Sequence, residues 1–272
     1  MPDSSKSSRS ADRRPPRRPV SSSASRGDDR RGTTQRPVSS RPAASRPVEP
    51  PIPDDVTWHD LDRDARAELR SLPKEMAERV GGHLAMAGIL IESDPEEARA
   101  HAAVARRLAS RVAVVREASA LTAYACGDFE TALTELRAYR RLSGDQSHLP
   151  LMADCERGLG RPERALELAV SPEGRGLPQE VARELRIVVA GARADLGQHD
   201  AALQHLEADP GLRAGVGDLS VLRLRYAYAD ALAHAGRADE AEKWFSMVAA
   251  ADADQVTDAA ERVASATGES GQ

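Results

Sequence analysis

The segment from Ala120 to Leu136, ALTAYACGDFETALTEL, carries the pattern that decides the fold. Gly127 stands between two runs of good helix formers, with alanine seven residues before it and again five residues after it. Glycine readily adopts the left-handed backbone conformation that ends a helix. The segment therefore predicts two helices joined by a tight turn at Gly127.

The same frame occurs three more times along the chain, around Gly160, Gly197 and Gly236. All eight flanking positions hold alanine: Ala120, Ala132, Ala153, Ala165, Ala190, Ala202, Ala229 and Ala241. Small residues at fixed offsets predict that the two helices of each unit cross closely there, because a larger side chain would push them apart. The position nine residues after each glycine is also apolar, as Leu136, Ala169, Leu206 and Phe245.

A fifth, degenerate unit lies upstream. Ser93 takes the turn position, Ala98 and Ala102 follow at the expected offsets, and Met86 replaces the first alanine. Successive turn positions are 34, 33, 37 and 39 residues apart. The two longer spacings contain the Pro- and Gly-rich stretches 171–178 and 209–217, which are typical of loop insertions.

The frame resembles the tetratricopeptide repeat over residues 78–255, and most resembles uncharacterised tetratricopeptide-like proteins of actinobacteria. Ala120, Gly127, Phe129, Ala132 and Leu136 fit the family pattern best. Later units replace the aromatic residue two after the glycine, and they lack the family's early aromatic residue and closing proline. The resemblance implies an all-α fold, an α-solenoid of four clear repeats and one degenerate repeat. Related α-solenoid families remain an alternative.

Outside the repeats, the sequence predicts a short helix from Leu61 to Leu72, capped by Thr57 or Asp60 and closed by Pro73. No stretch alternates apolar and polar residues with the period of a strand. We expect a disordered Ser/Arg/Pro-rich tail over 1–56, a helical repeat domain over 57–264 and a disordered C-terminus over 265–272.

Charge divides the chain unevenly. Residues 1–53 carry a net charge of +7, whereas residues 54–272 carry −12. One interpretation is that the basic tail contacts nucleic acid, sequence-blind because it lacks aromatic residues for base stacking. The other is that the charge serves solubility or a loose, non-specific contact.

The compartment predicted from the sequence is the cytoplasm. The N-terminal segment has positive charge but no apolar run of a signal peptide, and no later stretch is apolar enough to cross a membrane. Cys126 and Cys155 are too few for a disulfide framework and lack metal-site spacing.

In the tetratricopeptide family the first helix of each repeat lines a concave face. The resemblance therefore implies a partner-binding groove with Tyr124 and Tyr226 as anchors and with Arg157 and Arg223 pairing with carboxylates. A solvated polar face without a ligand is the alternative. The ten candidate groove residues are His83, Glu117, Tyr124, Asp154, Arg157, Glu184, Arg223, Tyr226, Asp230 and His234.

Motifs for catalysis are weak throughout the sequence. There is no phosphate-binding loop and no His-Glu-x-x-His motif, and the positions of both cysteines indicate core residues. We therefore expect no catalytic residue, metal or cofactor, and a cytoplasmic adaptor that binds other proteins. Trp244 and Phe245 belong either to the core or to an exposed contact for a second copy in a homodimer.

Overall fold

The computed structural model describes residues 49–215 and 218–269, and within these ranges it is all-helical, without a strand. The predicted all-α class is therefore confirmed. Residues 1–48 of the predicted tail and residues 270–272 lie outside the described residues. The α-helices of the described ranges are α1 (Arg63–Leu69), α2 (Lys74–Leu90), α3 (Pro95–Ala109), α4 (Ala113–Ala125), α5 (Phe129–Ser143), α6 (Leu149–Gly158), α7 (Pro162–Val170), α8 (Gln179–Asp195), α9 (His199–Glu207), α10 (Leu219–His234), α11 (Ala238–Ala251) and α12 (Ala259–Glu269).

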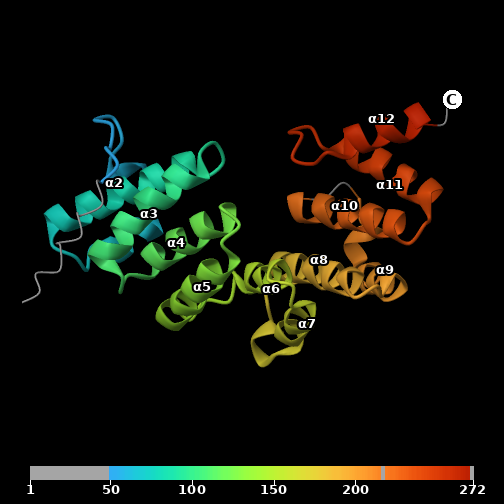
Figure 1. The fold of residues 1–272 in the computed structure, drawn as a ribbon, viewed down its shortest axis with the longest axis horizontal. Coiled ribbons are helices and arrows are strands. Elements are labelled where there is room, and N and C mark those ends of the chain that lie inside the picture. The colour runs from blue at the N-terminus through green and yellow to red at the C-terminus, as the bar shows by residue number, and fades with distance from the viewer. Residues whose placement is uncertain (1–48, 216–217, 270–272) are drawn as a thin grey trace, which may run out of the picture. The chain divides into compact units, whose positions relative to one another are not determined.

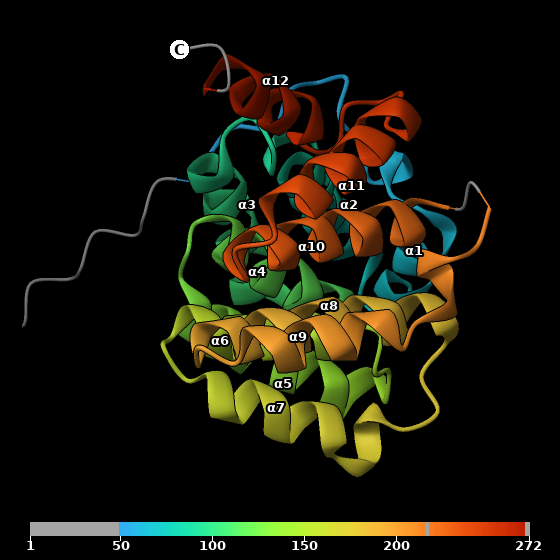
Figure 2. The same ribbon diagram turned by 90° about the vertical axis from the view of Figure 1, so that its right-hand side faces the viewer.

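Consecutive helices pack as pairs: α2 with α3, α4 with α5, α6 with α7, α8 with α9, and α10 with α11 (Figure 1). The first helices α6, α8 and α10 also pack against one another in a row. Figure 2 shows α8 and α9 running side by side, and α10 next to α11. This row of first helices positions the candidate site.

The four predicted turn glycines all adopt the left-handed conformation. Their φ angles are 72° at Gly127, 69° at Gly160, 72° at Gly197 and 76° at Gly236. In each turn the residue after the glycine donates its backbone N–H to a carbonyl five positions earlier, as Asp128 does to Ala123 at 2.9 Å. This bond satisfies a carbonyl that the helix end would otherwise leave free.

The eight alanines of the frame are all buried, with between 0% and 4% of their surface exposed. Ala98 and Ala102 of the degenerate unit are equally buried, and Met86 is 8% exposed. Each alanine therefore lies where two helices meet, as the offsets predict. The Asp128 side chain caps α5 by accepting from the Thr131 N–H at 3.1 Å.

The buried residues form three apolar clusters along the chain. The first joins α1, α2, α3 and the start of α4, the second runs from Ala120 on α4 to Ala192 on α8, and the third runs from Ala190 to Ala259. Because α8 contributes to the second and third clusters, it links the middle helices to α10–α12. Phe245 is 4% exposed and Trp244 packs edge-on against Tyr228, so this pair belongs to the core and does not form an exposed patch.

The start of the helical part differs from the prediction in one detail. Thr57 caps only a 3-10 turn, η1 (Trp58–Asp60), and Asp62 caps α1 by accepting from the Asp64 and Ala65 N–H groups at 2.8 Å. The two insertions also contain 3-10 turns, η2 (Pro172–Gly174) and η3 (Pro210–Leu212). Residues 49–52, from the segment assigned to the tail, reach α2, where Ile52 lies against Gly82.

Candidate functional site

Two neighbouring cavities lie along the row of first helices. The larger has a volume of about 770 Å³ and is lined by residues of α6, α8 and α10, by His199 at the start of α9 and by the segment before α12. The smaller, of about 490 Å³, is lined by residues of α4, α6, α8 and α10 and by the residues before α6. Leu219 and Arg223 line both cavities, so the two are adjacent. We call them together the α8–α10 groove.

Eight of the ten candidate residues line this groove. Arg157, Tyr226, Asp230 and His234 line the larger cavity, and Arg223 lines both. The remaining three, in the smaller cavity, are Tyr124, Asp154 and Glu184. The structure therefore brings together residues that the sequence separates by more than 100 positions.

His83 does not face the groove. It is 2% exposed and lies on α2, where its ring contacts His101 of α3. The family resemblance placed His83 on a ligand-facing surface, but in the degenerate first unit this position forms a contact between α2 and α3. His83 is therefore unavailable to a partner.

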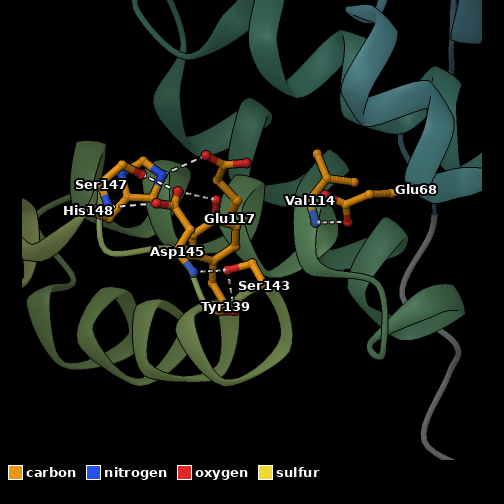
Figure 3. A network of polar contacts seen from close by, with 8 residues as sticks. All are labelled: Glu68, Val114, Glu117, Tyr139, Ser143, Asp145, Ser147 and His148. Carbon is orange, nitrogen blue, oxygen red and sulfur yellow. Dashed lines mark hydrogen bonds and ion pairs between the residues drawn. The ribbon is translucent and has the colours of Figure 1, made fainter. Parts of the chain in front are cut away.

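Glu117 lies beside the groove, and its carboxylate contacts another side chain of the protein, His148 (Figure 3). Its Oε1 atom contacts Nε2 of His148 at 2.6 Å, and the His148 ring packs edge-on against Tyr139. Tyr139 donates to Asp145 at 2.9 Å. This network fixes the connection between α5 and α6, so Glu117 positions His148, which lines the smaller cavity. The same figure shows Glu68 of α1 accepting from the Val114 N–H at 2.9 Å.

Arg157 is already paired within the chain. Its guanidinium donates to Asp195 at 2.8 and 3.2 Å and to Asp154 at 2.9 Å. It lies across Gly191, where an added Cβ would meet the guanidinium carbon at 2.6 Å. Glycine at 191 thus allows Arg157 to cross α8. A carboxylate of a partner, the predicted contact of Arg157, would have to compete with Asp154 and Asp195 for the guanidinium.

The two tyrosines predicted as anchors are both tied to carboxylates. Tyr124 donates to Asp154 and packs edge-on against Phe129. Tyr226 donates to Asp258 at 2.5 Å and packs edge-on against Phe245. Burial and the nearby carboxylate raise the pKa of Tyr124, and the same two causes raise the pKa of Tyr226 to about 12. Both rings are therefore fixed in place as neutral phenols.

Arg223 is the least restrained charged residue of the groove. Its side chain is 56% exposed, and its one ion pair in the described residues is with Glu184 at 3.4 Å. Asp230, by contrast, pairs with Arg262 at 3.0 Å and contacts His234 at 3.3 Å. Arg223 can therefore change partner at little cost.

Several groove residues were not predicted from the sequence. They include Glu180, Asp195, Asp218, Leu219, Val256 and Asp258. Glu180 could have been found, because it precedes the predicted Glu184 by one helical turn. The others lie at helix ends or in connections, where the repeat frame gives no position.

Neither cysteine has the environment of a reactive thiol. Burial raises the pKa of the Cys155 thiol to about 12 and also raises that of Cys126. Among the described residues, no group of three or more His, Cys, Asp or Glu has the arrangement of a metal site.

No protein-family model matches the chain, and no curated protein matches it in sequence. In the described part of the chain, none of the helices combines the length and the apolar character that crossing a membrane requires.

Proposed function

We propose that this chain is a cytoplasmic protein-interaction scaffold, an α-solenoid of tetratricopeptide-like repeats that binds a segment of another protein in the α8–α10 groove. The main support is that eight of the ten positions that the family resemblance implied line two adjacent cavities. The cavities have a combined size that suits a peptide or a helix face better than a small metabolite.

The repeat assignment rests on the turn geometry and on burial. Four left-handed glycines and eight buried alanines recur at the same offsets in paired helices. Stacked helix pairs cannot each bury their own apolar face, so they form a continuous core and leave a row of first helices for binding.

The experiment is an affinity purification of the tagged full-length chain from its native host, after cross-linking. The control is Ala227→Trp, which places a large side chain in the larger cavity. We expect specific proteins to be enriched by the wild-type chain and lost with the variant, while circular dichroism shows that the variant is folded. Identical protein sets from the two chains would refute groove binding.

A second function follows from the charge of residues 1–53, which carry +7 and lie almost entirely outside the described residues. We propose, as the alternative, non-specific contact with RNA or DNA through this segment. Nucleic-acid retention at low salt should then fall when residues 1–46 are removed. This boundary keeps Glu49, which pairs with Arg79 and Arg107. Equal retention by the two chains would refute the alternative.

A further inference from the structure

The groove carries a surplus of negative charge. Two arginines line it, Arg157 and Arg223, against seven carboxylates: Asp154, Glu180, Glu184, Asp195, Asp218, Asp230 and Asp258. Arg157 is saturated by Asp154 and Asp195. Among the described residues, Arg223 therefore remains as the only lining arginine or lysine for the other five carboxylates, although Arg262 pairs with Asp230 at 3.0 Å and Arg183 pairs with Asp218 at 3.7 Å from outside the lining.

Glu180 and Glu184 are two carboxylates of this surplus that have few partners within the chain. They are one turn apart on α8 and line the smaller cavity together. Glu180 is exposed and has no ion pair with any described residue, and Glu184 has only the 3.4 Å contact to Arg223. Burial raises the pKa of Glu184 even though Arg223 and Arg183 oppose that shift. A further cation beside Glu184 would offset the cost of burying its charged carboxylate.

Apolar surface lies exposed next to these carboxylates. Leu219, which lines both cavities, is 54% exposed, and Val256 of the larger cavity is 53% exposed. The lining of the larger cavity also includes five small residues, namely Ala190, Gly191, Ala194, Ala227 and Ala231. A trough of small residues with an exposed apolar rim accommodates a chain segment and gains from covering Leu219.

These observations identify the occupant by its chemistry, and the inference rests on the function proposed above. We infer that the groove binds a positively charged protein segment that places Lys or Arg side chains against Glu180 and Glu184 and an apolar side chain against Leu219. The same negative charge repels nucleic acid from this face.

Arg223 provides a test of the sign of the ligand's charge. If the partner is cationic, Arg223 competes with it for Glu184 and repels it. Arg223→Gln should then tighten binding. If the partner is anionic, Arg223 is its main contact and the same variant should weaken binding.

The experiment selects peptides from a random dodecapeptide phage library on the immobilised full-length chain. Synthetic versions of the enriched peptides are then titrated by fluorescence anisotropy. We expect the peptides to carry a clear positive net charge, to bind about tenfold more weakly to Glu180→Gln/Glu184→Gln, and to bind more weakly at high salt. The matched control is Glu163→Gln/Glu167→Gln, which removes two exposed carboxylates at the same spacing on α7, outside both cavities.

The outcomes separate the inference from the proposed function. Neutral or acidic peptides that bind the groove, or weaker binding to Arg223→Gln, would overturn the inference and leave the groove intact as a binding site. An equal loss of affinity in the α7 control would show general attraction to an acidic protein and also overturn it. No enrichment, or peptide binding that neither Ala227→Trp in the larger cavity nor Glu180→Gln/Glu184→Gln in the smaller cavity reduces, would count against the proposed function itself.

Discussion

The Nδ1 atoms of His83 and His101 lie 2.9 Å apart, between side chains that are 2% and 0% exposed. A hydrogen bond between these two atoms needs one ring to donate and the other to accept, so the neutral pair satisfies both atoms. A proton on each ring would place two donors and two charges face to face. The contact joins α2 to α3, so we expect the first helix pair to be sensitive to pH.

The first prediction concerns acid stability. Burial, and then the nearby His101, lower the pKa of His83 from 6.5 to about 4, and burial also lowers the pKa of His101. Glu49 and Glu97 oppose these shifts, and Arg79 and Arg107 reinforce the shift at His83. Below pH 6.5 the unfolded chain gains protons that the folded chain does not, so the free energy of unfolding should fall between pH 6.5 and 4, by at most about 3 kcal/mol from His83.

Urea unfolding at pH 7.5, 6, 5 and 4 measures this dependence. The control is the double variant His83→Leu/His101→Leu. It removes both rings, so no single ring is left buried without its hydrogen-bond partner. The double variant should lose less stability than the wild type over the same range. A double variant with an unchanged pH dependence would show that other groups cause the acid sensitivity.

The second prediction concerns the turn glycines. Gly160 has a φ of 69°, and an added Cβ would have no atom within 4 Å, so a substitution meets only the backbone cost. We expect Gly160→Ala to lower the free energy of unfolding by about 1 kcal/mol. Gly160→Asn should cost less, because asparagine tolerates the left-handed conformation. Chemical denaturation that ranks alanine at least as stable as asparagine would contradict this turn geometry.

The third prediction compares two glycines within helices. A Cβ at Gly158 would lie 2.5 Å from the Phe129 ring, whereas a Cβ at Gly88 of α2 would meet nothing within 4 Å. Gly158→Ala should therefore destabilise the fold by about 1–3 kcal/mol. Gly88→Ala should stabilise it by about 0.5–1 kcal/mol, because alanine restricts the unfolded chain. Thermal melting followed by circular dichroism measures both, and two shifts of the same sign would contradict the packing described here.

The sequence predicted the features that depend on local backbone conformation and on side-chain size. It predicted few of the contacts that depend on charge. Gly127 and Ala132 could be placed from a repeated frame, because a turn and a close helix crossing each need one residue type. Thr57 and Asp62 are both good caps, so the start of α1 could not be chosen from composition. The burial of His83 depends on its contact with His101, 18 positions away, which no local pattern encodes.

The last prediction concerns Glu135, a buried carboxylate whose side chain is 1% exposed on α5. It accepts from Arg116 at 2.7 Å and pairs with Arg106 at 2.8 Å, so its charge is compensated from α4 and α3. We expect Glu135→Gln to lower the free energy of unfolding by about 2 kcal/mol, because two charge-assisted bonds are lost while the arginines can regain water. Glu130→Gln, an exposed position on the same helix, is the matched control and should change stability by less than about 0.5 kcal/mol.

A similar ion pair occurs on the next helix, α6, and this makes the prediction sharper. Glu156 is buried and pairs with Arg137 at 3.0 Å, and Arg137 precedes it by 19 positions, as Arg116 precedes Glu135. If the cost comes from losing a buried ion pair between neighbouring helices, Glu156→Gln should cost about as much as Glu135→Gln in urea unfolding. A cost at either site no larger than that of Glu130→Gln would show that the buried ion pair is neutral for stability, as some buried pairs are.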